Sequence, residues 1–353
     1  MPGACVLPKI RFVAEGSDVV AADVDLLVLA ELNPDVLVST GDLDVRFGQV
    51  EQLVDQATIT LGSSGAITAC AAAAQGLRVA VCAVIGDDPI GEWTAGQLRG
   101  HGVDVGGVIR RTGRSTGMSV VLTRPDGDRA ILTYSGTMPE LTAADVDGAR
   151  LRAARHVHAS SFFLQRGLQA GLPGLLAAAR EAGATTSLDT GWAPAGDWAC
   201  PGPALRHLHY LLPNAAECAH LAAALVGKVQ ERPADQDSPT QAATIRAAQA
   251  LRRLGPDVVV KLGADGALAV TADGAVRVKG RAVAPVDTTG AGDCFNAGFI
   301  AAVLDRATTA DALRRAVASG SLAVTGWGGT GRLATRAEAL AGSSYPAEQL
   351  PTG

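Results

Sequence analysis

The sequence lacks paired cysteines, long apolar runs and an excess of basic residues. Its six cysteines are scattered without a C-x-x-C pair, which argues against a disulfide framework and against a zinc site. No stretch approaches the ~18–20 uninterrupted apolar residues of a membrane span, and the opening MPGACVLPKIRF has no continuous apolar signal-peptide core. With 30 Lys and Arg against 35 Asp and Glu, the chain has no basic surplus to attract nucleic acid. We therefore expect a cytoplasmic protein that binds neither membranes nor nucleic acid and takes a small-molecule ligand.

Two common nucleotide-binding motifs are also missing. No G-x-x-x-x-G-K-[ST] sequence occurs, which excludes a P-loop. The run GWGGTG (326–331) fits G-x-G-x-x-G formally, but it follows a helical stretch instead of a strand and opens no βαβ unit. A nicotinamide oxidoreductase of similar α/β layout is therefore disfavoured.

What the chain does have is a regular alternation of short β-branched runs with Ala- and Leu-rich stretches of helical length. This alternation predicts an α/β fold, in which a mostly parallel central sheet carries helices on both faces. The 353 residues are compatible with one large domain, 1–353, with residues 1–24 as an N-terminal extension. The predicted strands are nearly continuous apolar runs, as expected of strands buried on both faces: 25–32, 78–86, 156–160, 185–189, 210–214 and 257–263.

Helices are expected between these strands, over 65–76, 168–182 and 240–254. The last one has a start signal, because Ser238 can cap it, Pro239 occupies its first turn and Gln241 can close a capping box.

Two early segments, approximately 36–61 and 112–136, break the rhythm of strand and helix. The second contains two alternating strands, 118–134, around an Asp126-Gly127 turn. Together the segments predict a small separate sheet, interpreted as a lid over the carboxyl ends of the main strands. One apolar face of this hairpin needs burial on the main domain or on a second subunit: Val120, Leu122, Ile131 and Thr133.

The stretch DTTGAGDCFNAGF (287–299) contains the residues that we expect to take part in catalysis. A Gly-rich loop leads into an apolar helix whose N-terminus falls near Gly290 to Asp293, so several free backbone N–H groups point at one spot. Such donors form an anion hole suited to phosphoryl transfer. Asp293 is then suited to accept a proton from an attacking hydroxyl. Such general-base catalysis contributes about 10²–10⁴-fold to the reaction rate. The alternative for Asp293 is an ordinary N-cap or first-turn acid.

This stretch resembles the carboxy-terminal signature of the PfkB carbohydrate kinase family, also called the ribokinase family. LGSSGAITACAAAAQGLRVAVCAVIGDDPIGEW (61–93) resembles its amino-terminal signature, and LLPNAAE (211–217) its Asn-x-x-Glu motif. The resemblance implies a ribokinase-like three-layer α/β fold with a β lid, and ATP-dependent phosphorylation of a sugar hydroxyl with Mg²⁺. It makes Asp293 the catalytic base and Gly290, Ala291 and Gly292 the anion hole. Members often pair their lids, so a homodimer through the lid is expected.

Asn214 and Glu217 can lie on one side of the first turn of a helix. Hard oxygen ligands suit Mg²⁺, which usually keeps several of its waters, so an indirect role through water is expected. Alternatively Asn214 caps the helix and Glu217 closes a capping box, and both interpretations can hold together.

The sugar contacts are expected near the first strand. Asn33 and Asp35 share one face of an extended segment and resemble the Asn-x-Asp sugar contact of the family, although Asn-Pro also signals a turn. Gly62 and Ser63 stand where members often carry Gly-Gly. Ile67 stands where ribokinases proper carry Asn, which weakens any claim of ribose specificity.

The nucleotide is expected at VVVKLGADGALAV (258–270), where the family places ATP. Lys261, Gly263, Gly266 and Asn214 are the candidate contacts. At the two glycines a base or ribose can lie against bare backbone. A hairpin turn without a ligand is the alternative. Asp287 borders a monovalent-cation loop in the family, which adds K⁺ as a further candidate ion.

Three further polar residues lie in or after predicted strands. His156 and His158 alternate along a strand and are interpreted as core histidines instead of metal ligands. Asp189 follows a strand and is a candidate for substrate or phosphate contact. The resulting hypothesis is an ATP- and Mg²⁺-dependent kinase of a small sugar. The alternatives are a nucleoside kinase and a non-catalytic sensor of sugar or nucleotide.

Overall fold

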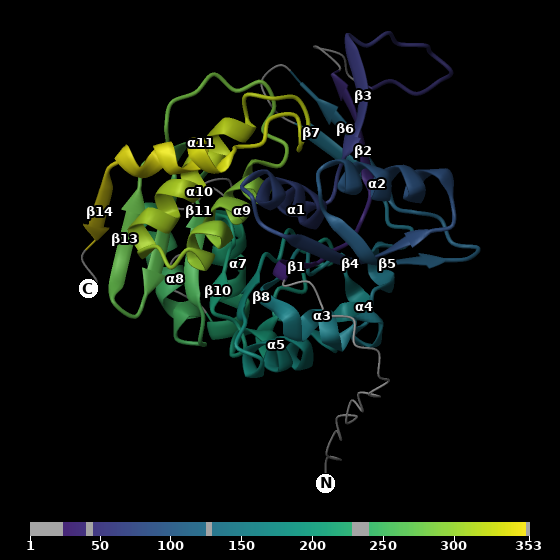
Figure 1. Ribbon diagram of the computed structural model, residues 1–353. Helices are drawn as coiled ribbons and strands as arrows, with labels where there is room; N and C mark the ends of the chain where they lie inside the picture. Colours follow the sequence, from purple (N-terminus) through teal and green to yellow (C-terminus); the bar gives the residue numbers. More distant parts are fainter. Residues whose placement is uncertain (1–23, 40–44, 125–128, 228–239, 351–353) are drawn as a thin grey trace.

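The computed structural model describes residues 24–39, 45–124, 129–227 and 240–350, and it arranges their strands in two sheets (Figure 1). The large sheet has ten strands in the order β14-β13-β12-β11-β10-β9-β8-β1-β4-β5. Neighbours from β11 to β5 run parallel, and β12 to β14 add an antiparallel edge. The predicted mostly parallel sheet is confirmed. Its strands are β1 Val24–Leu29, β4 Val79–Gly86, β5 Asp104–Arg111, β8 Ala154–Ala159, β9 Thr185–Leu188, β10 Tyr210–Leu211, β11 Asp257–Lys261, β12 Ala267–Thr271, β13 Gly274–Val278 and β14 Ala347–Leu350.

The six predicted strands all lie in this sheet. The run 210–214 forms only the two-residue strand β10, since Pro213 has no N–H to donate to a neighbouring strand. Alternate residues of β1 face opposite layers: Leu27 and Leu29 pack into one core, Leu26 and Val28 into another. The continuous apolar runs therefore reflect burial on both faces.

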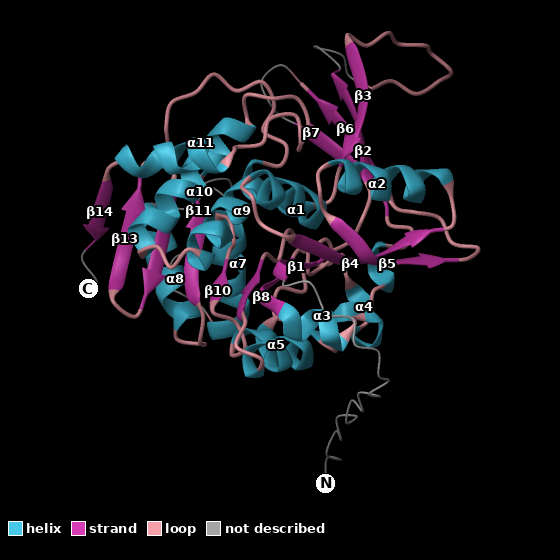
Figure 2. Cartoon of the chain, viewed as in Figure 1, coloured by secondary structure: helices cyan, strands magenta, loops and turns pink. Residues whose placement is uncertain are grey.

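Helices cover both faces of the large sheet, as Figure 2 shows, which completes the predicted three layers. One layer contains α1 Ser64–Ala74, α2 Pro89–Gly100, α9 Ala291–Leu304 and α10 Thr309–Ala323. The other contains α3 Gly148–Ala153, α5 Leu172–Glu181, α7 Ala215–Val226 and α8 Gln241–Arg252. Shorter helices complete the chain: α4 Arg166–Gln169, α6 Gly202–Leu205, α11 Arg336–Ala341, and the 3₁₀ turns η1 Met138–Glu140, η2 Ala143–Asp145, η3 Gly263–Asp265 and η4 Gly342–Ser344.

Two helix predictions need correction. The helix predicted over 168–182 is interrupted, because α4 ends at Gln169 and α5 starts after Gly171, with Pro173 in its first turn, where proline is tolerated. The helix predicted from 240 is α8, but its N-cap is Thr240, whose hydroxyl accepts the Ala243 N–H at 3.3 Å. The predicted cap, Ser238, and Pro239 lie outside the described residues. In place of a capping box, the Gln241 side chain accepts a hydrogen bond from Arg277.

A separate small sheet has the order β3-β2-β6-β7 and continues from β1, beyond the carboxyl edge of the large sheet (Figure 1). Its strands are β2 Pro34–Ser39, β3 Gln56–Leu61, β6 Met118–Thr123 and β7 Arg129–Tyr134. The predicted second sheet is thereby confirmed. Within 36–61, however, residues 45–55 form no strand.

The register of the β6–β7 hairpin differs from the prediction. Val120 pairs with Leu132 and Leu122 with Ala130, so Ile131 and Thr133 point to the opposite face. A two-residue turn at Asp126-Gly127 would have paired Leu122 with Ile131, but residues 124–128 separate the paired ends Thr123 and Arg129. The turn itself lies outside the described residues.

The two faces of the small sheet have different environments. The inner face carries Asp35 together with Leu37 and Val121, which are 2% and 3% exposed. The opposite face, called the outer face below, carries the apolar side chains of Val36, Val38, Ile59, Val120, Leu122 and Leu132. On it Ile59 and Leu132 are 60% and 64% exposed. Among the described helices, none is long and apolar enough to cross a membrane.

Candidate active site

Charged side chains gather where the carboxyl ends of the central strands meet the first turn of α9. Glu31 follows β1, Asp189 follows β9, Lys261 ends β11, and Asp293 lies in the first turn of α9. Parallel strands bring their carboxyl ends to one edge of a sheet, which is where such folds bind ligands. The topology therefore brings together groups that are far apart in the sequence.

The first turn of α9 is the predicted anion hole, although the Ala291 N–H already donates to the Thr288 carbonyl at 3.3 Å, and anion binding there stays a prediction. Gly290 is the N-cap residue, with φ 75°, and no side chain of the described residues caps this turn. A Cβ on Gly290 would lie 2.7 Å from the Cα of Gly329, so only glycine fits between the two loops. The amides of Ala291 and Gly292 begin the helix, where the helix dipole is positive and an anion is favoured.

Asp293 is a desolvated carboxylate that hydrogen bonds to α1. The Ser64 hydroxyl donates to its Oδ1 at 2.5 Å. The side chain is partly accessible to solvent, but protein surrounds it on most sides, and this desolvation, with the nearby charge of Asp189, raises its pKa to about 7. Since Gly290 is the N-cap, Asp293 does not cap the helix. A carboxylate with a pKa near neutrality is suited to general-base chemistry.

Lys261 forms an ion pair with Asp189 next to the predicted anion hole. Its Nζ lies 2.5 Å from Asp189 Oδ2, and the Asn296 amide donates to the same oxygen at 2.6 Å. Burial favours the neutral amine, but the carboxylates of Asp189 and Glu217 outweigh it and hold the pKa of Lys261 above its ordinary value. A Cβ on Gly292 would lie 3.6 Å from Lys261 Nζ, so the ammonium group adjoins the helix N-terminus.

The carboxylate of Asp189 is enclosed by protein donors. It is 4% exposed, and burial would favour its neutral form, but Lys261 and Asn296 outweigh burial and hold its pKa below the ordinary value. Its oxygens accept hydrogen bonds from Lys261, Asn296 and the Gly191 N–H, so protein donors alone account for Asp189, and its contact with substrate or phosphate stays a prediction.

Asn214 and Glu217 form the capping box that was one of the two interpretations. Asn214 Oδ1 accepts the Glu217 N–H at 2.9 Å, and Glu217 Oε2 accepts the Asn214 N–H at 2.8 Å. Burial and the charge of Asp189 raise the pKa of Glu217 to about 7, against the opposing effect of Lys261. A carboxylate beside an ammonium group fits Mg²⁺ through water better than direct ligation. Across the described ranges, no group of three or more His, Cys, Asp or Glu could hold a metal directly.

The predicted sugar contacts lie together beside β2. Asn33 Nδ2 donates to Asp35 Oδ1 at 2.9 Å, and burial raises the pKa of Asp35 to about 6. A Cβ on Gly62 would lie 2.2 Å from Asp35 Oδ1, so the glycine is needed for this approach. Ser63 has a left-handed φ of 67°, which glycine adopts more readily, yet its hydroxyl caps α1 and donates to the Glu31 carbonyl.

The predicted nucleotide hairpin is present, as β11, the turn η3 and β12. Gly263 has φ 58° and its open side meets nothing within 4 Å. Gly266 has φ 93°, and a Cβ there would lie 2.1 Å from the carbonyl oxygen of Val278. The turn alone therefore accounts for Gly266, and its nucleotide contact stays a prediction.

Asp287 ties two loops together. Its Oδ1 accepts the amide and hydroxyl of Thr289, and its Oδ2 accepts the Gly328 N–H at 2.8 Å. Both oxygens already serve protein donors, so the carboxylate is a poor ligand for K⁺ and the cation remains a prediction. His156 and His158 hydrogen bond to Thr185 and Ser187, which confirms them as core histidines.

Three residues near the site were missed by sequence reasoning. Glu31 is 2% exposed with its pKa raised to about 7 by burial, and a carboxylate at the end of an apolar strand was the available signal. Ser64 contacts Asp293, although nothing in its local sequence indicates this. Arg129 of β7 donates to Thr289 Oγ1 at 3.4 Å, and so connects the small sheet to the loop before α9.

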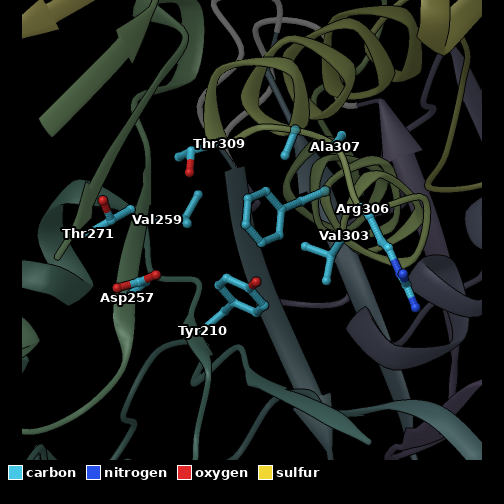
Figure 3. Close-up of a pocket in the computed structure, with 10 residues that line it drawn as sticks. Tyr210, Asp257, Val259, Thr271, Val303, Arg306, Ala307 and Thr309 are labelled. Carbon is cyan, nitrogen blue, oxygen red and sulfur yellow. The ribbon is translucent and has the colours of Figure 1, made fainter. Parts of the chain in front are cut away.

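A cavity of about 170 Å³ (Figure 3) lies at the amino ends of the parallel strands β10 and β11, whereas Asp293 lies near the carboxyl ends. Tyr210 and Asp257 line it where β10 and β11 begin, and Val303 lines it near the end of α9. It is therefore separate from the groups around Asp293.

Comparison with known proteins identifies this arrangement. The pattern of the "pfkB family carbohydrate kinase" matches residues 25–336. The chain belongs to the PfkB family of carbohydrate kinases. This membership confirms the predicted enzyme class, a carbohydrate kinase.

The chain resembles several members along most of its length. It is 28% identical over 322 residues to a ribokinase of Haemophilus influenzae, covering 89% of this chain and 97% of that protein. It is 33% identical over 261 residues to an ATP-dependent ribose-1-phosphate kinase of Halopiger xanaduensis, covering 74% of this chain and 79% of that protein. The structure of Arabidopsis thaliana ribokinase complexed with ribose and ATP matches with a TM-score of 0.76 and 24% identity, over 92% of this chain and 100% of that one. This match confirms the ribokinase-like fold.

Proposed function

We propose that this PfkB kinase transfers the γ-phosphoryl group of ATP to a hydroxyl of a small sugar, with Asp293 as general base. The observation that carries the proposal is the position of Asp293, one residue past the anion hole and with its pKa raised to about 7 by desolvation. In this position one carboxylate can accept the proton of an attacking hydroxyl while the adjacent amides stabilise charge on the transferred group.

The phosphate side of the reaction uses backbone and cationic groups. The amides of Gly290, Ala291 and Gly292 would bind the transferred phosphoryl group, assisted by the helix dipole and by the Lys261 ammonium group. Asn214 and Glu217 would hold Mg²⁺ through its waters. When bound, Mg²⁺ neutralises charge on the phosphates of ATP.

The acceptor side uses the polar residues beside β2. Asp35 and Asn33 would bracket adjacent hydroxyls, with Gly62 and Ser63 forming the floor. The small sheet would act as a lid, because its inner face carries Asp35 and Arg129 reaches Thr289 at the anion-hole loop. Closure would exclude water from the reacting groups.

The acceptor is proposed to be a sugar, since relatives of this chain are named ribokinase, ATP-dependent ribose-1-phosphate kinase and fructokinase. Ile67 stands where ribokinases proper carry Asn, so the protein is not proposed to be specific for ribose. The test is ADP release with ATP, Mg²⁺ and a panel of pentoses, hexoses, sugar phosphates, sugar acids and nucleosides. Turnover of a nucleoside alone would favour the nucleoside kinase, and sugar binding without turnover would favour a sensor.

The accompanying variant is Asp293→Asn. We expect kcat to fall at least about 10²-fold, because the amide cannot accept the proton, with ATP binding nearly unchanged. Asp311→Asn is the matched control, since Asp311 is also a first-turn acid but lies on α10, half-exposed and beside Asp305 at the C-terminal end of α9. Full turnover by Asp293→Asn would overturn the assigned role.

A further inference from the structure

One face of α1 donates two hydrogen bonds to Asp293 in the first turn of α9. Ser64 and Thr68 lie one helical turn apart, so their side chains share a face. The Ser64 hydroxyl donates to Asp293 Oδ1 at 2.5 Å, and the Thr68 hydroxyl donates to the Asp293 backbone carbonyl at 3.3 Å. Two donors of one helix thus fix the side chain and the main chain of the same residue.

Ser64 is itself fixed from the other side. Its backbone N–H donates to Glu31 Oε1 at 3.1 Å, and the preceding Ser63 hydroxyl donates to the Glu31 carbonyl. Ser64 therefore lies between two carboxylates, with its amide on Glu31 and its hydroxyl on Asp293. The N-cap of α1 is Ser63, so the Ser64 hydroxyl is not needed to begin the helix.

We propose that Ser64 is a positioning residue for the general base, which holds Asp293 Oδ1 so that Oδ2 is presented to the acceptor hydroxyl. The inference rests on the proposed role of Asp293. A hydroxyl donor stabilises the ionised carboxylate relative to the neutral acid, so Ser64 also keeps the base deprotonated at a lower pH than burial alone would allow.

The other charged groups that face Asp293 come from three strands. Desolvation is the largest influence on Asp293, the charges of Asp189 and Glu31 also raise its pKa, and Ser64 and Lys261 lower it. All of these charges remain when the Ser64 side chain is shortened. A change in the titration of Asp293 in such a variant therefore reports the hydroxyl.

The experiment is the pH dependence of kcat/KM for Ser64→Ala and Ser64→Thr, with the best acceptor from the panel. We expect the acidic limb of Ser64→Ala to move up by about one pH unit and its kcat to fall about tenfold, because a hydrogen bond to a charged group is lost. Ser64→Thr keeps the hydroxyl, so its acidic limb and its kcat should both lie close to those of wild type. The KM for ATP should stay within about twofold, since Ser64 contacts the base and not the nucleotide.

Thr68→Val is the matched control, because it removes the bond to the Asp293 carbonyl and leaves the carboxylate contact. We expect a lower Tm and an unmoved acidic limb. An acidic limb of Ser64→Ala at the wild-type pH would overturn the positioning role, as would an equal shift in Thr68→Val. If Asp293→Asn is inactive while Ser64→Ala is normal, only this inference fails; if Asp293→Asn keeps its turnover, the proposed base is wrong.

Discussion

At the residue scale, desolvation is the common property of the acidic groups in the site. It is the largest influence on Glu31, Glu217 and Asp293, and each has its pKa raised to about 7. Asp189 is the exception, because its direct ion pair with Lys261 keeps it ionised. The direct contacts with Lys261 and Asn296 thus lower the pKa of Asp189, whereas desolvation raises the pKa of the other three carboxylates.

This difference predicts that Asp189 supports stability more than chemistry. Asp189→Asn should lower the free energy of unfolding by about 3–5 kcal/mol, because it leaves the charge of Lys261 without its partner in a largely buried position. The double variant Asp189→Asn/Lys261→Met should regain part of the loss, since neither charge is then buried alone. Urea unfolding of both variants measures the effect.

Asp197→Asn is the control for this prediction, because Asp197 lies in the same loop but is exposed. It should unfold like wild type. Equal stability of Asp189→Asn and Asp197→Asn would mean that the ion pair contributes nothing measurable.

At the element scale, the start of α7 combines a capping box with the proposed site for Mg²⁺. Glu217→Gln separates the two roles, since glutamine can also close a capping box while its charge is lost. We expect a nearly unchanged Tm and about a tenfold rise in the Mg²⁺ concentration for half-maximal activity. The measurement is an Mg²⁺ titration of turnover beside thermal unfolding.

The chain contains a matched control in α11, where Thr335 and Glu338 form a second capping box. Glu338→Gln should leave the Mg²⁺ titration as in wild type. If Glu217→Gln also leaves it unmoved, the Asn-x-x-Glu motif of this chain is only a helix cap.

The elements that could be predicted from the sequence are those fixed by local patterns. Continuous apolar runs located the strands, and the Gly-rich loop located the N-terminus of α9. The β6–β7 register was wrong, because it depends on how many residues the turn uses, and a shift of one residue exchanges the two faces. Ser64 was missed since it lies 229 positions from Asp293, and no local spacing reports a contact at that distance.

At the scale of the whole molecule, the outer face of the small sheet is only partly covered within the described chain. Val36, Val38, Val120 and Leu122 lie on it beside the more exposed Ile59 and Leu132. A contiguous apolar face of this kind marks an interaction site, and a four-stranded sheet with free edges risks aggregation unless it is covered. A second copy of the same face is the proposed cover, which gives a homodimer through the lid.

The prediction is that Leu122→Asp weakens self-association and raises the KM for the sugar more than the KM for ATP. A charge on the paired faces must be desolvated on association, and the loosened small sheet carries Asp35 on its other face. Sedimentation of wild type and variant, with steady-state kinetics for both substrates, measures the two effects. Leu340→Asp, at a 43% exposed leucine of α11, is the control and should change neither. A wild type that sediments as a monomer at micromolar concentration rules out the paired lids, and equal effects on both KM values would mean that the small sheet does not close on the acceptor.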